Sequence, residues 1–264
     1  MKSVFTLFGV AFIAIPAAAQ VDYRNLDHGR PVSVEDAYPI ERYAFEFIAG
    51  YRIGRPGEGQ TFQSLRLGLS NGIFPGAEAG IGLIGALRSD RRGTETGVGG
   101  IQLSALVNLA AERVRLPGLG IRVDGVLPVG RWGGEGAGAM VHLLATRSVG
   151  RNRVHLNAGA AIVRQRRPGA DESVPLWRVG VAVDRTLIRS STLLLADLSL
   201  AREEAGAPGE LGAGLGVRRQ ITPVLVLDAG LAVGFRPDRR STVAVTLGAS
   251  RSFGVAGLMP GGAR

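Results

Sequence analysis

The chain has 264 residues, including 40 glycines and no cysteine, and this length suits one or two ordinary domains or one large all-β domain. Without cysteine it can form no disulfide, no thiolate metal site and no cysteine nucleophile. Its formal net charge is +9, and because Lys2 is the only lysine, arginine carries that charge.

The beginning of the chain has the three regions of a secretory signal peptide. A short basic start precedes an apolar run from Val4 to Ile15, and alanines at positions 17–19 offer a cleavage site. The run is too short for a membrane-spanning helix, which needs about 20 apolar residues. We therefore expect residues 1–19 to be removed, with cleavage near Ala19, and the rest of the chain to be exported.

Most of the remaining chain has the alternating pattern of β-strands. In one segment Ile101, Leu103 and Ala105 fall on one face, whereas Gln102 and Ser104 fall on the other. A helix would scatter these side chains around its circumference, but a strand sorts them onto two faces. Twelve such segments are predicted, with typical lengths close to the 9–11 residues that cross a bilayer as a tilted strand. They lie at residues 41–53, 60–70, 77–87, 98–109, 119–129, 138–147, 153–163, 175–185, 192–201, 210–218, 224–235 and 241–253.

The connections between these segments alternate in character. One set is rich in glycine, proline and charge, and each member opens with an arginine, as in residues 164–175 and 236–240. The other set is tighter, as in residues 71–75. A repeated hairpin with loops at one end and turns at the other predicts an up-and-down antiparallel barrel. A soluble β-sandwich is the alternative, although nothing in the sequence marks the crossovers that it would need.

The two faces of the strands can be used in two ways. A membrane barrel turns its apolar face to lipid and its polar face to the lumen, whereas a soluble protein turns its apolar face to a core. Export, amphipathic strands, aromatic residues near strand ends (Phe62, Trp132 and Phe235 among them) and glycines on the polar faces favour the membrane barrel. The predicted lumen-lining residues are Glu46, Arg66, Glu78, Gln102, Arg122, Asp124, His142, His155, Arg178, Asp184, Asp197 and Asp228.

The predicted fold is thus all-β, a transmembrane up-and-down antiparallel barrel of about 12 strands. It spans residues 41–253, after a periplasmic N-terminal segment at 20–40 and before a C-terminal tail at 254–264. We expect it in the cell outer membrane.

The chain also resembles a known family, the Gram-negative outer-membrane barrels described as transporters of the meta-pathway of phenol degradation. The resemblance covers roughly residues 40–253. It rests on the signal peptide, the aromatic first strand at 44–51, glycine-rich hairpins such as 65–75, and the short lead at 25–37. It implies a transport barrel, and it brings no catalytic motif, so no functional residue is carried over. Such barrels commonly end in an aromatic residue, whereas here Phe253 is followed by eleven more residues.

The chemical candidates in the predicted lumen each have two interpretations. His142 and His155 lie on successive strands and can be cross-strand neighbours, either as a metal or proton site or as two solvated residues. The second interpretation is favoured because no third ligand is evident. The charged residues form either a selectivity constriction or a closed network of ion pairs. No serine stands in a convincing pair with a histidine, so we predict no enzyme, no cofactor and no metal site.

The leading functional prediction is passive passage of small solutes, hydrophobic ones among them, through a polar lumen. A closed structural or surface-interaction barrel and a soluble periplasmic β-protein are the alternatives. The expected partners are outer-membrane lipids, lipopolysaccharide phosphates at the arginine-led loops, the barrel assembly machinery and a small solute, with no nucleic acid. The sequence does not specify the solute.

Overall fold

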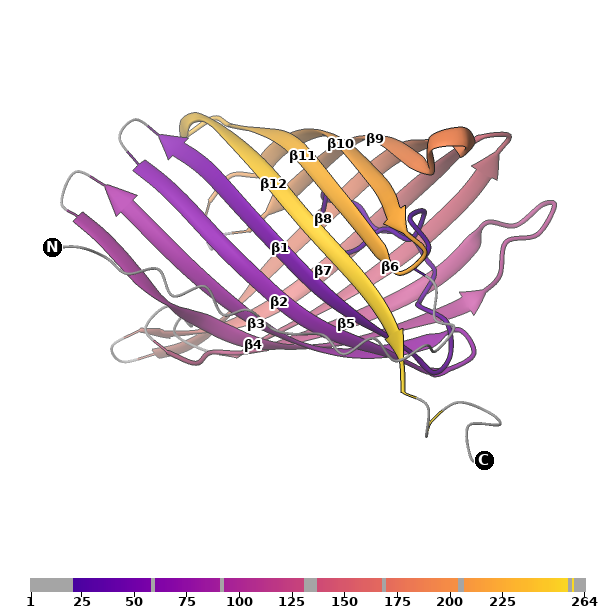
Figure 1. The fold of residues 1–264 in the computed structure, drawn as a ribbon. Coiled ribbons are helices and arrows are strands. Elements are labelled where there is room, and N and C mark those ends of the chain that lie inside the picture. The colour runs from indigo at the N-terminus through magenta and orange to yellow at the C-terminus, as the bar shows by residue number, and fades with distance from the viewer. Residues whose placement is uncertain are drawn as a thin grey trace, which may run out of the picture.

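The computed structural model describes residues 21–57, 60–90, 93–130, 137–167, 170–203, 207–255 and 258, so the expected signal peptide and Trp132 lie outside the described residues. Twelve strands form one closed antiparallel barrel in which sequence neighbours pair and β1 pairs with β12 (Figure 1). The prediction of an all-β up-and-down barrel is confirmed. In the described part of the chain, no helix has the length and apolar character needed to cross a bilayer.

The strands and the single 3-10 turn have the following bounds: β1 (Ala44–Gly57), β2 (Gln60–Phe74), β3 (Ala77–Asp90), β4 (Gly93–Ala110), β5 (Gly118–Leu127), β6 (Gly138–Val149), β7 (Asn152–Arg167), β8 (Ala170–Leu187), η1 (Ile188–Ser190), β9 (Thr192–Arg202), β10 (Glu210–Thr222), β11 (Leu225–Arg236) and β12 (Arg239–Gly254).

Several strands run further than the hydrophobic alternation predicts. The sequence predicts a loop over residues 164–175, but β7 continues to Arg167 and β8 begins at Ala170, with Arg164 opposite Ser173. Backbone hydrogen bonds hold this hairpin extension, and they need no apolar face. At the opposite end of the barrel most connections are short turns, two of which use glycines at positive φ, Gly76 at 76° and Gly150 at 64°. The connection between β4 and β5, residues 111–117, is longer.

The barrel is closed by the pairing of its first and last strands. Phe45 in β1 lies opposite Phe253 in β12, and their rings stack with centroids 5.5 Å apart. This pairing uses the backbone groups that would otherwise form two open sheet edges. The predicted alternation of faces also holds along β4, where Leu103 is 47% exposed and its neighbour Gln102 is 9% exposed.

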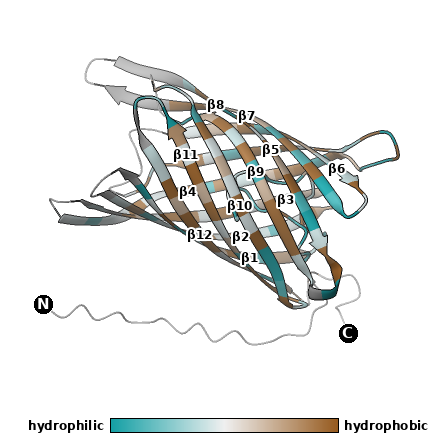
Figure 2. Ribbon diagram, turned by 90° about the horizontal axis from the view of Figure 1, so that it is seen from above, coloured by the Kyte–Doolittle hydropathy of each residue, from teal (hydrophilic) through white to brown (hydrophobic). Residues whose placement is uncertain are grey.

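The outer surface of the barrel is apolar across its middle. Large apolar side chains such as Leu143, Leu156 and Leu215 are exposed on three different strands. Hydrophobic positions recur along the strands and hydrophilic ones gather towards several strand ends (Figure 2). Phe74 and Phe235 near the ends are also exposed, as the predicted aromatic girdle requires. Phe62 does not belong to this girdle, because it shares the inner face of β2 with Arg66 and lines the lumen.

Residues 21–40 fold back into the lumen, and we call this segment the N-terminal plug (Figure 1). From the sequence, residues 20–40 are expected to form a periplasmic segment ahead of the barrel, whereas the structure places residues 21–40 inside it, starting at the turn end. The first backbone contact there is a hydrogen bond from the Val21 amide to the Pro223 carbonyl. The plug contains no regular secondary structure apart from an isolated bridge between Asp27 and Arg30.

Two apolar clusters hold the plug against the inner wall. Leu26 and Val32 of the plug pack with Leu193 and Leu195 of β9, and all four are buried. On the other side of the lumen, Ala37 packs with Leu106 of β4 and Leu144 of β6. The barrel therefore has a small hydrophobic core inside its lumen, made jointly by the wall and the plug.

Candidate functional site

The N-terminal plug contacts the whole circumference of the lumen. Among the residues that the structure describes, its hydrogen bonds and ion pairs reach every strand except β8, where Val34 lies against Gly180. A segment that touches all of the strands must cross the lumen from wall to wall. The other wall partners, from β1 to β12, are Ala49, Arg66, Glu78, Asn108, Arg122, Thr146, Asn157, Asp197, Arg218, Asp228 and Ser250.

Side chains of the wall supply hydrogen bonds for the irregular backbone of the plug. Asn157 of β7 accepts from the Glu35 amide at 2.8 Å and donates to the Glu35 carbonyl at 2.9 Å. The Ser33 amide donates to Asp197 at 2.9 Å, and the Ile40 amide donates to Glu78 at 2.8 Å. Because a buried backbone group without a partner is costly, these polar side chains are what allow a coil to lie inside the barrel.

A buried ion-pair network joins the plug to β10 and β11. Asp27 of the plug lies 2.6 Å from Arg218 and 2.7 Å from Arg30, and Arg30 lies 2.9 Å from Asp228. Burial alone would raise the pKa of Asp27, but the two guanidinium groups outweigh burial and lower this pKa to about 2. Asp27 is therefore ionised at neutral pH, and the charges alternate in sign between the plug and the wall.

A second network joins the plug to β5. Arg122 lies 3.4 Å from Glu35 of the plug and 3.0 Å from Asp124 on its own strand, and Gln102 donates to Asp124 at 2.8 Å. Burial opposes ionisation of Glu35, yet the charges of Arg122 and His28 hold the pKa of Glu35 below its usual value. Glu35 is thus a buried carboxylate that stays charged.

A third network joins the plug to β7 and β8. Arg153 bridges Asp36 of the plug, at 3.3 Å, and Asp184 of the wall, at 2.6 Å. Burial raises the pKa of Asp36 to about 6 even though Arg153 and His155 act in the opposite direction. His155 is held between Asp184, at 2.8 Å, and Thr146, at 3.0 Å. The side chains of this network are almost fully enclosed.

Glycines on the inner wall make room for the plug. A Cβ on Gly230 would lie 2.0 Å from the Pro31 carbonyl oxygen, and one on Gly216 would lie 2.9 Å from the Pro31 ring. A Cβ on Gly120 would meet the backbone of Ala37 at 3.1 Å. Inner-face glycines are expected where a narrow barrel curves, and the close approach of the plug is a second reason for them.

The structure places the predicted lumen-lining residues on the inner side of the wall, with different neighbours. Nine of them are buried: Glu46, Glu78, Gln102, Asp124, His142, His155, Asp184, Asp197 and Asp228. Arg66, Arg122 and Arg178 are half-buried. Most of these residues contact the plug or each other. Arg178 instead pairs with Glu203 near the opposite end of the barrel.

The two histidines on successive strands do not meet, which corrects the interpretation of His142 and His155 as cross-strand neighbours or solvated residues. His142 lies opposite Gly159, and His155 lies opposite Thr146, so four residues of register separate them. Both are buried, at 2% and 0% exposure. The alternation predicts their face correctly, but the pairing depends on the turn between β6 and β7, which fixes the register.

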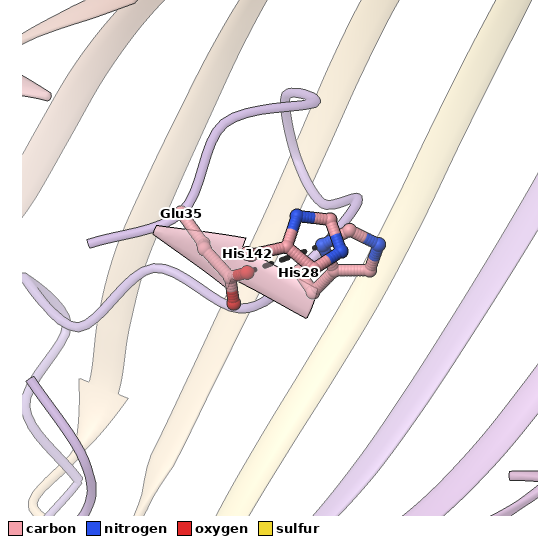
Figure 3. A group of neighbouring side chains, drawn as sticks. All are labelled: His28, Glu35 and His142. Carbon is pink, nitrogen blue, oxygen red and sulfur yellow. Dashed lines mark ion pairs between the residues drawn. The ribbon is translucent and has the colours of Figure 1, made fainter. Parts of the chain in front are cut away.

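His142 instead faces two residues of the plug. His28 Nδ1 lies 3.3 Å from Glu35 Oε1, and the His28 and His142 rings lie 5.0 Å apart between centroids (Figure 3). One ligand atom from each of these three residues lies within 4.8 Å of the others. No third ligand is evident from the sequence because Glu35 and His28 are remote from His142 in the chain and come to it only through the folding of the plug.

A cavity of about 800 Å³ lies between the plug and the loop end of the barrel. Its lining includes His28 and Arg30 of the plug, Arg66 and Arg178 of the wall, and Phe62 near the β1–β2 hairpin. The lumen is therefore filled by the plug at the turn end and hollow beyond it.

The residues that sequence reasoning misses are mainly those of the plug, Asp27, Arg30, Glu35 and Asp36. Their positions in a short polar lead carry no periodic signal. Arg153 and Arg218 of the wall are missed too, although each lies on the predicted inner face of its strand; Arg153, for example, lies two residues before His155. Assigning every charged residue of a strand to a face by its odd or even position would have identified both.

Solved structures share this fold at low sequence identity. An outer-membrane channel from Pseudomonas putida F1 has a TM-score of 0.64 and 13% identity over 86% of this chain and 100% of that chain. The NanC porin has a TM-score of 0.54 and 12% identity over 78% and 98%. The translocator domain of the autotransporter NalP from Neisseria meningitidis has a TM-score of 0.52 and 12% identity over 80% and 88%.

No protein-family model matches the sequence, and no curated protein matches it. The structural likenesses include both channels and an autotransporter domain, at identities at which only the fold is shared. The chain therefore has the closed antiparallel barrel fold of outer-membrane proteins.

Proposed function

We propose that this chain is an outer-membrane channel for small solutes whose lumen is closed at the turn end by the N-terminal plug. The observation that carries the proposal is the combination of an apolar outer surface with a polar lumen that holds a cavity of about 800 Å³. The structural likeness to an outer-membrane channel, which covers the full length of that channel, supports the proposal. The finer proposal, from the family resemblance, is a transporter of the kind described for the meta-pathway of phenol degradation, with a small hydrophobic solute.

The proposed function also implies which molecules contact the barrel. Outer-membrane lipids would cover the apolar outer surface, lipopolysaccharide phosphates would meet arginines at the loop end, and the barrel assembly machinery would insert the chain. We propose no nucleic-acid partner, and we assign no enzymatic role to the lumen.

A second candidate is a closed structural barrel that transports nothing. The plug's contacts with all twelve strands favour it, because a plug held by several buried ion pairs resists release. The two functions differ in whether the plug leaves the lumen.

A reversible cross-link between plug and wall distinguishes them. A Cβ on Gly180 would lie 2.8 Å from Val34 Cγ2, so the double variant Val34→Cys, Gly180→Cys brings two thiols within reach of a disulfide in a chain with no other cysteine. We expect no conductance in planar bilayers when this variant is oxidised, and channel openings after reduction. The two single-cysteine variants serve as controls and should be insensitive to reductant.

Silence of both the oxidised and the reduced variant would contradict transport and favour the closed barrel. Equal conductance in both states would show that the plug does not close the lumen. Recovery of the protein in the osmotic-shock supernatant rather than in the outer-membrane fraction would contradict both candidates.

A further inference from the structure

We propose that His28, Glu35 and His142 form a binding site for a divalent transition-metal cation of the zinc class, which ties the N-terminal plug to the wall of the barrel. The site is made of two imidazoles and one carboxylate, from two parts of the plug and from β6 (Figure 3). The proposal rests on the placement of the plug inside the lumen. The test of metal binding does not require that the barrel conducts ions.

The three side chains have ligand atoms that are shielded from water and make no hydrogen bond. Glu35 is 1% exposed and His142 is 2% exposed. Among the described residues, His28 Nδ1, Glu35 Oε1 and His142 Nε2 have no hydrogen-bond partner. The first two form an ion pair with each other, and His142 Nε2 lies 3.9 Å from Asp124 Oδ2. A buried polar atom without a hydrogen bond is costly, so three such atoms at one place favour a bound ligand.

The distances suit a small cation. In a tetrahedral zinc site with bonds of about 2.0–2.1 Å, neighbouring ligand atoms lie about 3.3 Å apart. The separation of His28 Nδ1 and Glu35 Oε1 is 3.3 Å, and the ligand atoms of all three residues lie within 4.8 Å of one another. Rotation of the His142 ring and a small shift of the plug would complete the triad, and a water molecule would take the fourth position.

The charges around the triad also suit a cation. Glu35 offers Oε1 because its other oxygen, Oε2, accepts from Arg122 at 3.4 Å. Arg122 is itself within 3.9 Å of Glu78 and 3.0 Å of Asp124, so carboxylates offset its positive charge. Two nitrogen ligands favour zinc and similar metals over magnesium or calcium, which prefer sites made only of oxygen.

The position of the ligands gives the site a consequence. Two ligands belong to the plug and one belongs to the wall, so the metal would bind only when the plug is in the lumen. A ligand that binds one conformation stabilises that conformation. Zinc would therefore favour the closed barrel.

Zinc binding to the folded full-length barrel in detergent tests the site. After chelator treatment and dialysis against zinc chloride, we expect one zinc per chain, and at least a tenfold loss of affinity in His142→Gln and in His28→Gln. His155→Gln is the matched control, since His155 is also buried on the neighbouring strand but already bonds Asp184 and Thr146, and it should bind zinc as the wild type does. Heat-modifiable migration on gels shows that each variant is folded.

The absorption of cobalt offered in place of zinc gives a second readout that needs no variant, with intense visible bands expected for a tetrahedral site. No stoichiometric zinc uptake by the folded wild type would overturn the proposal, as would equal uptake by the His28 and His142 variants. If zinc binds but the barrel never conducts, the metal site stands and the proposed transport function fails.

Discussion

At the scale of single residues, the lumen is organised by pairs of opposite charge in which one partner comes from the plug. Asp27 meets Arg218, Arg30 meets Asp228, and Asp36 meets Arg153. A buried charge without a partner is costly, so these pairs couple the plug to the wall, although Arg153 also pairs with Asp184 of the wall. The polar face of the barrel is therefore built around a specific segment of its own chain rather than around bulk water.

A single methyl group on the inner wall should weaken the docking of the plug. Gly230→Ala would place a Cβ 2.0 Å from the Pro31 oxygen, and overpacking of this kind costs about 1–3 kcal/mol. We expect the amides of Ser33, Glu35 and Ala37, which are bonded to the wall, to exchange their hydrogens about tenfold faster or more.

Gly68→Ala is the matched control for this measurement. Gly68 also faces the lumen, but a Cβ there would meet its nearest neighbour at 3.7 Å, which is an ordinary contact. Its plug amides should exchange as in the wild type. Unchanged protection in Gly230→Ala would contradict the close approach of Pro31 to the wall.

At the scale of single elements, each strand presents one face outward and one face inward. In β4, Leu103 is exposed on the outer surface, and Gln102 bonds Asp124 on the inner side. An outward arginine costs about 2–4 kcal/mol at the middle of a bilayer. We therefore expect Leu103→Arg to reduce the amount of folded barrel in the outer-membrane fraction, and Gln102→Arg to assemble at close to the wild-type level.

Heat-modifiable migration on gels measures the folded fraction of each variant. The two positions are adjacent in sequence and receive the same new side chain. A difference in folded fraction between the two variants therefore reflects the face on which the arginine lies and not the added charge itself. Similar assembly of both variants would count against the assignment of faces.

The strands are also the level at which the sequence is most informative. Alternation in segments such as residues 101–109 predicts the strand and its faces, because these follow from local geometry. The repeated hairpin connections predict which strands pair. Alternation fails where both faces are apolar: Leu193 and Leu195 of β9 point inward and pack on the plug, so a search for polar inner faces passes over them. The plug itself has no periodic pattern, and its wall partners lie from 19 to 223 residues away in the chain, so no local signal places it inside the barrel.

At the scale of the whole molecule, a closed barrel holds its own N-terminal segment and a cavity. The outer surface is suited to lipid, the inner wall is suited to the plug, and the plug divides the lumen into a filled part and a hollow part. Any transport therefore requires movement of the plug, and any ligand that binds plug and wall together opposes that movement. The outward apolar surface is the condition on which these conclusions depend.

Spin labels placed singly at residues 102–107 of β4 in lipid vesicles measure this directly, because oxygen dissolves in lipid and a nickel chelate stays in water. Labels at 103, 105 and 107 should collide with oxygen and be protected from the chelate, while labels at 102, 104 and 106 should show little contact with lipid-dissolved oxygen. The opposite alternation, with the odd positions reached by the aqueous chelate or shielded from lipid, would show that the apolar face is buried in a core and would contradict the membrane barrel.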